Sequence, residues 1–268
     1  MDTALDAEAL RAKLVAPNGP YAALDVVEST PSTNADLAAT PGAADRTVLI
    51  ALEQTAGQGR RGRTWSSPRG GLYVSVLFRP ADVPPSRLPW LNLIAGLALV
   101  RVAQSVGVEA SLKWPNDLLL GPDAGKGAGI LSEITADGSV VVGIGLNVAK
   151  LPSDVQPAPG GLAPTSLEDA GAAGLDREEL AFRLLVELAG LEGVWRKNGG
   201  DAEESGVLEE YQEHSATIGQ RVRVELSGGV ELEGVAVRIE PDGTLTVRGT
   251  DGVDHGVSAG DVVHLRRA

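Results

Sequence analysis

The spacing of apolar and polar residues divides the chain into two regions with different patterns. Up to about residue 215, long segments with an apolar residue every three or four positions alternate with short runs rich in β-branched residues. This alternation is typical of a domain that combines helices and strands. From about Thr217 onward, the pattern changes to short stretches in which apolar and polar residues alternate. The sequence therefore predicts two domains, 1–215 and 216–268.

Within the first region, the pattern predicts several helices and strands. Residues 84–107 begin with prolines, end in glycine and carry an apolar stripe, so we expect the long buried helix there. Further helices are expected near 8–15, from Ser32, and over 176–198 and 203–213, and strands over 22–28, 46–54, 71–79, 110–120, 128–136 and 139–148. Residues 151–164 are rich in proline and glycine and are predicted to form a surface loop.

The second region is typical of a small all-β domain. Its short alternating segments are separated by the turn sequences SGG, PDG and TDG. A unit of about 50 residues with this pattern predicts a small β-barrel, and a barrel of that size is only marginally stable alone.

Composition and charge narrow the range of functions. The 268 residues include 43% hydrophobic residues and no cysteine, and the formal net charge is -13. Such an acidic chain is a poor general binder of nucleic acid, which is held through many phosphate contacts. The N-terminal segment is too polar for a signal peptide, and the longest apolar run is interrupted by Asn92 and Arg101. We therefore expect a soluble cytoplasmic protein that binds neither nucleic acid nor membrane.

One local feature contrasts with this acidic composition. Residues 57–65, GQGRRGRTW, combine three glycines with three arginines. The glycines have G-x-G-x-x-G spacing, but a dinucleotide fingerprint opens a helix, whereas here a proline and two glycines lead into a strand. Glycines let backbone N–H groups approach ligand oxygens closely, and arginines offer planar forks to phosphate or carboxylate. This cationic loop therefore predicts a site for a small anionic ligand.

A second glycine-rich segment, GPDAGKG at 121–127, resembles a Walker A loop but lacks the Ser or Thr that would hold magnesium. Lys126 lies between two of its glycines. We expect a mobile loop around Lys126. The residues alone leave open whether this loop delivers a cation to a site or is a solvated hairpin turn.

Several segments occur in an order and spacing that resemble those of the biotin–protein ligases. They are STN (32–34), EQTAGQGRRGRTWSSP (53–68), KWPND (113–117), KGAGILSE (126–133) and GIGLN (143–147). The C-terminal region is similar to the small SH3-like domain of that family. The resemblance covers about residues 22–266. It implies an α/β (α+β) catalytic domain around a mixed, largely antiparallel sheet, followed by the SH3-like β-barrel. Because only about 20 residues precede the first strand, too few for a helix-turn-helix domain, we expect the monofunctional type without an N-terminal DNA-binding domain.

The resemblance also implies an activity. Members of the family use ATP and Mg²⁺ to convert biotin into biotinyl-5′-AMP and pyrophosphate. They then transfer biotin to a lysine of the biotin carboxyl carrier domain of an acetyl-CoA or acyl-CoA carboxylase. We expect a monomer or a weak homodimer. Two alternatives stay open, namely a ligase of the same fold that acts on lipoate, and a non-catalytic protein that responds to biotin.

The family's site residues can be transferred to the matching positions of this sequence. Arg60 and Lys126 are the expected catalytic residues, which would neutralise the biotin carboxylate and the α-phosphate. Biotin contacts are implied for Ser32, Thr33, Asn34, Gln54, Gly57, Gln58, Arg60, Lys126, Gly129 and Leu131, and ATP contacts for Arg60, Arg63, Trp65, Asn116, Asn147 and Arg266. Asp117 is the candidate to assist a magnesium ion that is bound mainly through ATP. The position of Gln58 is usually basic in the family, so adenylate retention should be weaker here unless only the backbone of this residue binds.

Overall fold

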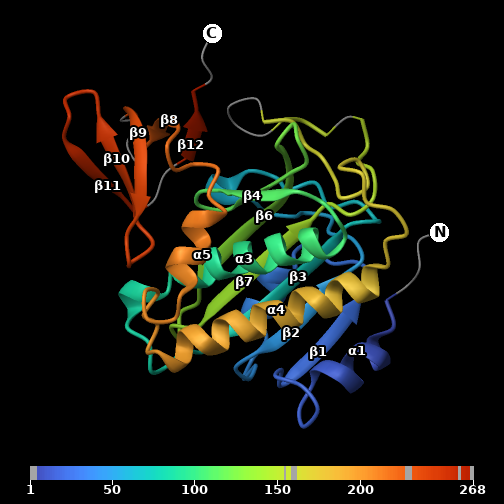
Figure 1. Ribbon diagram of the computed structural model, residues 1–268. Coiled ribbons are helices and arrows are strands. Elements are labelled where there is room, and N and C mark those ends of the chain that lie inside the picture. Colours follow the sequence, from blue (N-terminus) through green and yellow to red (C-terminus); the bar gives the residue numbers. More distant parts are fainter. Residues whose placement is uncertain (1–4, 154, 158–161, 227–230, 259–260, 266–268) are drawn as a thin grey trace.

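Two β-sheets of different construction organise the chain (Figure 1). The computed structural model describes residues 5–153, 155–157, 162–226, 231–258 and 261–265. The first sheet contains β1 (Ala23–Val27), β2 (Thr47–Ala51), β3 (Leu72–Phe78), β4 (Ala110–Lys113), β5 (Asp117–Leu120), β6 (Gly125–Ile134) and β7 (Val140–Leu146). The helices around it are α1 (Ala7–Leu14), α2 (Thr33–Ala38), α3 (Trp90–Ser105), α4 (Arg177–Lys197) and α5 (Val207–Glu213).

The large sheet is mixed and largely antiparallel, as the resemblance implied. Its strand order is β1-β2-β3-β7-β6-β5-β4. The β1–β2 pair is parallel, and every other neighbouring pair is antiparallel. The central strand, β7, pairs Gly143 with Ser75 of β3 and Gly145 with Gly129 of β6. The middle of the sheet therefore carries very small side chains next to one another.

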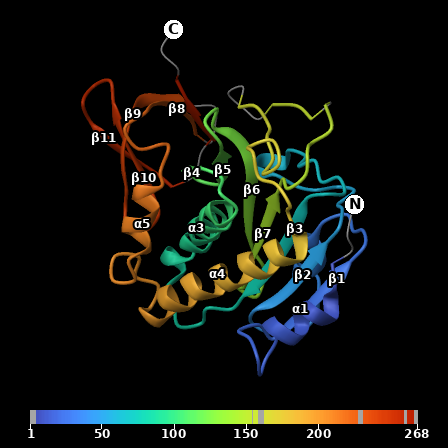
Figure 2. The same cartoon turned by 45° about the vertical axis from the view of Figure 1, so that its right-hand side comes forward.

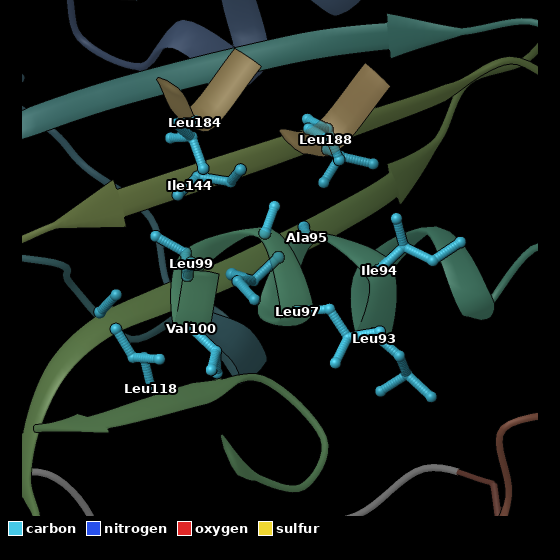
Figure 3. Close-up of a cluster of buried hydrophobic side chains, with 14 of the residues drawn as sticks. Leu93, Ile94, Ala95, Leu97, Leu99, Val100, Leu118, Ile144, Leu184 and Leu188 are labelled. Carbon is cyan, nitrogen blue, oxygen red and sulfur yellow. The ribbon is translucent and has the colours of Figure 1, made fainter. Parts of the chain in front are cut away.

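The two faces of this sheet have opposite character. Helices α3 and α4 cross one face (Figures 1 and 2), and Ile144 of β7 packs there against Leu184 and Leu188 of α4 (Figure 3). Because successive strand residues point to opposite faces, Gly143 and Gly145 face away from this core. One face therefore builds the hydrophobic core, and the glycine face admits segments that approach the backbone closely.

Helix α3 is the centre of the core, and 12 of its 16 residues are buried. It begins at Trp90 rather than at 84 because the prolines of this segment form a short 3-10 turn at Pro85–Arg87 first; proline suits the first turn of a helix but not its interior. By length and composition, Pro85–Ser105 could cross a membrane, but 72% of its most apolar part is buried inside the protein.

The second sheet confirms the all-β pattern predicted for the C-terminal region. It contains β8 (Arg221–Glu225), β9 (Glu231–Ile239), β10 (Leu245–Gly249), β11 (Asp254–Val257) and β12 (Asp261–His264) in the antiparallel order β11-β10-β9-β8-β12. One apolar cluster continues from α3 into this domain, and the indole N–H of Trp90 donates to the carbonyl of Pro241 (2.7 Å). We propose the boundary at 215/216, which falls between α5 and β8.

A buried ion cluster holds α4 against the segment that precedes β2. Glu192 of α4 is 0% exposed and pairs with Arg46 and Arg196. Arg196 also pairs with Asp45 (Nη1 to Oδ2, 2.5 Å). Charges that have been removed from water are stable only beside well-placed opposite charges, so each member of this cluster depends on the others.

We predict that Glu192→Gln lowers the free energy of unfolding by about 3 kcal/mol, because Arg46 and Arg196 would then face a neutral group. Urea denaturation followed by circular dichroism measures this change. The control is Glu179→Gln on the same helix, where the Glu179–Arg183 pair is about half exposed; it should cost less than about 1 kcal/mol. Equal costs for the two variants would contradict a special role for the buried cluster.

Candidate active site

A cavity of about 480 Å³ lies on the glycine face of the large sheet. Its walls come from the start of α2, the cationic loop, the segment 113–117, strands β6 and β7, the described part of 151–164, and β12 of the C-terminal domain. Most of the residues expected at the site line it: Ser32, Thr33, Asn34, Gln54, Gln58, Arg60, Arg63, Trp65, Asn116, Asp117, Lys126, Gly129, Leu131 and Asn147. Gly57 is not among the lining residues, and Arg266 lies outside the described residues.

The floor of the cavity depends on glycines that leave room for other side chains. A Cβ atom at Gly143 would lie 2.1 Å from Oδ1 of Asn34, and one at Gly145 would lie 2.3 Å from Nε1 of Trp65. Real Cβ atoms do not come this close to other atoms. These two glycines are therefore required for α2 and the cationic loop to approach the sheet.

The wall near α2 is a network of hydroxyl and amide groups. The backbone N–H and the hydroxyl of Thr33 both donate to Oε1 of Gln54 (2.9 and 3.1 Å), and Nε2 of Gln54 donates to the hydroxyl of Ser67 (2.9 Å). Ser32 caps α2, accepting a hydrogen bond from the N–H of Ala35. Buried polar groups arranged in this way can bind a neutral polar ring and fix its orientation.

Asn34 also lines the cavity, but its amide is already bound to the protein. Its Nδ2 donates to the carbonyl of Leu131 (3.0 Å) and to Oε2 of Glu133 (2.8 Å), and its Oδ1 accepts from Ser75 (2.7 Å). The side chain of Asn34 therefore holds α2 against β6 and β3.

The cationic loop is a tight hairpin that sends its arginines in two directions. Gln58 pairs with Thr64, and the N–H of Gly59 donates to the carbonyl of Arg63 (2.7 Å). Arg60 and Arg63 line the cavity. At the tip, Arg61 adopts a left-handed conformation (φ 56°) and donates to the carbonyl of Glu225 at the end of β8 (3.0 Å). Arg61 thus attaches the loop to the C-terminal domain, whereas Arg60 and Arg63 line the cavity.

Gly57 packs within the cationic loop and does not line the cavity. It is buried, and its carbonyl accepts a hydrogen bond from the N–H of Trp65 (2.8 Å). A Cβ atom at this position would lie 2.5 Å from the carbonyl oxygen of Trp65. We assign Gly57 to the packing of the loop against Trp65.

The structure corrects the expected loop around Lys126. Lys126 is part of β6, where it pairs with Leu119 of β5, and its N–H donates to the carbonyl of Ala163 (2.8 Å). The flanking glycines serve close packing and not a turn. A Cβ atom at Gly125 would lie 2.9 Å from Thr165, and one at Gly127 would lie 2.1 Å from Leu120. A rigid strand therefore presents this lysine.

A single carboxylate organises the cations. Asp117 lies 2.6 Å from Nζ of Lys126 and 3.5 Å from Nζ of Lys113 (carboxylate oxygen to nitrogen in each case). Arg60 donates to Oδ1 of the adjacent Asn116 (3.4 Å). The described lining holds one carboxylate, that of Asp117, and four cationic side chains: Arg60, Arg63, Lys113 and Lys126. The cavity is thus strongly positive inside an acidic protein, which suits a polyanionic ligand.

Sequence reasoning missed two parts of the site. Lys113 stands in the KWPND motif but was given no role. The described part of 151–164 was predicted to form a surface loop, yet it lines the cavity through Leu151, Val155, Gln156, Pro157, Leu162 and Pro164. Apolar residues between prolines in a predicted surface loop were the available signal, because a loop without a binding role has little need of them.

Three buried polar atoms in the lining have no hydrogen-bond partner within the described part of the chain. One of them, Oδ1 of Asp117, is ion-paired with Lys126. The other two are Oδ1 of Asn147 and Nε1 of Trp65. The Nδ2 of Asn147 donates to the carbonyl of Thr165 (2.9 Å), so its other end is fixed. The Trp65 ring lies 5.2 Å from Nζ of Lys126. Buried polar atoms are usually paired, so these two atoms indicate a ligand with both donor and acceptor groups.

Comparisons with known proteins identify the family of this chain. The model of the Biotin/lipoate A/B protein ligase family matches residues 24–148, and that of the Biotin protein ligase C terminal domain matches residues 217–265. A biotin–[acetyl-CoA-carboxylase] ligase from Mycobacterium tuberculosis is 44% identical over 270 residues, which cover 98% of this chain and 96% of that relative.

Solved structures show the same fold. The biotin protein ligase from Aquifex aeolicus in complex with biotin and ATP has a TM-score of 0.73 and 24% identity, covering 92% of this chain and 100% of that chain. The Leishmania major enzyme in complex with biotinyl-5-AMP has a TM-score of 0.60 and 27% identity, covering 90% of this chain and 100% of that chain. From its sequence, its fold and the residues around its cavity, this chain belongs to the biotin–protein ligase family.

Proposed function

We propose that this chain is an ATP-dependent biotin–protein ligase. It forms biotinyl-5′-AMP from biotin and ATP, and then transfers biotin to a lysine of the biotin carboxyl carrier domain of a carboxylase. The observation that carries the proposal is one cavity that unites Arg60 and Lys126 with the polar wall around Gln54. The M. tuberculosis relative, a biotin–[acetyl-CoA-carboxylase] ligase, supports a carboxylase carrier as the partner.

The first half-reaction joins two anions. A carboxylate oxygen of biotin attacks the α-phosphorus of ATP, and pyrophosphate leaves with the electron pair of the broken P–O bond. Two unit charges about 4 Å apart repel by roughly 4 kcal/mol at an effective dielectric constant near 20. Arg60 and Lys126 offset this repulsion and stabilise the charge of the transition state, and Arg63 contacts the remaining phosphates. The carboxylate is itself the nucleophile, so the reaction needs no nucleophilic side chain.

The polar wall receives the biotin ring. Thr33 and Gln54 are held by each other and by Ser67, which leaves their orientation fixed before the ligand arrives. Ser32 lies beside them in the lining, and Gly129 and Leu131 offer backbone groups from β6. A wall of fixed hydroxyl and amide groups suits the ureido ring of biotin, which has both N–H donors and a carbonyl acceptor. Gln58 adds an uncharged side chain to the cavity lining. Arg60 and Lys126 therefore bind the carboxylate of biotin.

The nucleotide lies against Trp65 and the described part of 151–164. The indole ring and the apolar residues of that segment provide surfaces for an adenine base, and Asn116 and Asn147 provide amide groups. Magnesium fits this cavity through phosphate oxygens, because the one carboxylate of the described lining, Asp117, is paired with two lysines. When bound, the ion would add positive charge at the leaving pyrophosphate.

In the second half-reaction, the neutral amine of the carrier lysine attacks the carbonyl carbon of biotinyl-5′-AMP. An amide bond forms, the amine releases a proton, and AMP leaves with the electrons of the broken C–O bond. Arg60 and Lys126 are placed to stabilise the charge of the departing phosphate, as they do in the first step.

The activity is tested by mixing the purified chain with Mg-ATP, biotin and a biotin carboxyl carrier domain. We expect biotin-dependent release of pyrophosphate and biotin on one lysine of the carrier, detected by mass spectrometry. Pyrophosphate release with lipoate but not with biotin would favour the lipoate-type alternative. Tight binding of biotin without pyrophosphate release would favour a non-catalytic biotin-binding protein.

Removing either central cation should slow the first half-reaction. We predict that Arg60→Ala and Lys126→Met each reduce kcat/KM for biotinyl-5′-AMP formation by about 10²–10³-fold, the usual effect of losing one group that stabilises transition-state charge. Pyrophosphate release is the measurement. Arg183→Ala, which removes an exposed cation from α4, should keep the wild-type rate. A wild-type rate for Arg60→Ala would remove Arg60 from its assigned role.

The close approach of Trp65 to β7 gives a further prediction. Gly145→Ala forces the indole out of its position because the new Cβ would lie 2.3 Å from Nε1. We expect the KM for ATP to rise at least about tenfold, since the surface assigned to adenine moves. The control is Gly190→Ala on α4, where a Cβ atom meets nothing within 4 Å. Unchanged KM values for both variants would contradict the assigned position of the adenine base.

A further inference from the structure

The segment 113–117 supplies several groups to the cavity, yet it lies at the edge of the large sheet. Lys113, Asn116 and Asp117 all line the cavity, and Asn116 and Asp117 contact Arg60 and Lys126. The segment connects β4 to β5, and β4 is the outermost strand of the sheet. The first domain holds this turn at Pro115, whose carbonyl accepts a hydrogen bond from Asn92 (2.7 Å), and at Asn116, which exchanges backbone and side-chain hydrogen bonds with Ile130 (2.9 and 3.2 Å). The position of Trp114, between these residues and β4, requires a separate explanation.

Residues 214–217 provide the first part of that explanation. The N–H of Leu112 in β4 donates to the carbonyl of His214, and the N–H of Ala216 donates to the carbonyl of Leu112 (2.8 Å each). The N–H of Trp114 then donates to the hydroxyl of Thr217 (3.0 Å). This row of bonds runs along the edge of β4 and extends into the turn that carries Asn116.

The C-terminal domain holds the same turn through the side chain of Trp114. The indole N–H of Trp114, a residue that is 1% exposed, donates to the carbonyl of Gly243 in the turn between β9 and β10 (3.1 Å). Both partners of Trp114 therefore lie after residue 215. The C-terminal domain therefore fixes Trp114 through both its backbone N–H and its indole N–H.

The hydroxyl of Thr217 connects this turn to β12. Its oxygen accepts the N–H of Trp114 and lies 3.1 Å from Nε2 of His264. Burial and the nearby charge of Lys113 lower the pKa of His264 to about 4. The ring is therefore neutral near pH 7, and its Nε2 atom can accept a hydrogen bond. Thr217 is 0% exposed, and its hydroxyl contacts both Trp114 and His264.

We propose, on the basis of the function given above, that Thr217 is a positioning residue for the formation of biotinyl-5′-AMP. Its hydroxyl fixes Trp114, and through the segment 113–117 it sets the positions of Asn116 and Asp117. Those two residues in turn hold Arg60 and Lys126 where the carboxylate and the α-phosphate meet. Displacement of a catalytic group by about 1 Å can cost about 10²-fold in rate, so a single buried hydroxyl has a measurable effect on catalysis.

The test compares Thr217→Val with Thr217→Ser in biotin-dependent pyrophosphate release, at a temperature well below the Tm of every variant. Valine has the shape of threonine without the hydroxyl, and serine keeps the hydroxyl. We expect Thr217→Val to lower kcat at least about tenfold while the KM for biotin changes less than about threefold, because the polar wall around Gln54 is held independently of this segment. Thr217→Ser should restore kcat to within about threefold of wild type.

Thr246→Val is the matched control. It removes another buried hydroxyl from the same domain, one that donates to Glu240, and it should keep the wild-type kcat. The inference is overturned if Thr217→Val turns over like wild type, or if the serine and valine variants are equally slow. It is also overturned if the lost activity of Thr217→Val equals its unfolded fraction. A wild-type chain without biotin-dependent turnover would overturn the proposed function and this inference together.

Discussion

The structure depends on holding several positive charges close together in a cavity with limited access to water. Like charges at these separations repel, and the repulsion grows as the surroundings become less polar. Asp117 is the one carboxylate in the described lining that opposes this repulsion, and it does so by contacting Lys113 and Lys126 together. An anionic ligand adds negative charge, which further offsets the repulsion between these cations. The cavity is thus electrostatically prepared for a carboxylate and phosphates while the folded chain as a whole stays acidic.

The large sheet makes this arrangement possible because its two faces are built from different residues. Ile144 and its apolar neighbours join α3 and α4 in a well-packed core (Figure 3), and Gly143 and Gly145 on the other face leave room for the side chains of Asn34 and Trp65. A rigid sheet fixed by its core can hold ligand-binding groups more accurately than loops alone can. Lys126 illustrates the advantage, because its backbone in β6 pairs with Leu119 of β5 on one side and with Pro164 on the other.

Much of this was predictable from the sequence, and the exceptions have physical causes. The strands, the buried helix and the shared location of Arg60 and Lys126 follow from local pattern and from motifs. The position of Lys126 in a strand was not predictable, because glycine gives the same local signal for a turn and for close packing of backbones. The contacts of Trp114 with Thr217 and Gly243 join residues more than a hundred positions apart, and no local pattern records such a contact. Arg266 and the boundary at 215/216 remain predictions.

The turn at 241–243 lies against two tryptophans of the first domain, with the carbonyl of Pro241 bonded to Trp90 and that of Gly243 bonded to Trp114. Each indole N–H would be buried without an acceptor if a different barrel presented this surface. Recombination between relatives therefore cannot exchange the C-terminal unit freely. A chimeric chain would keep both indole N–H groups paired only where the incoming barrel offered two carbonyl groups at the same places.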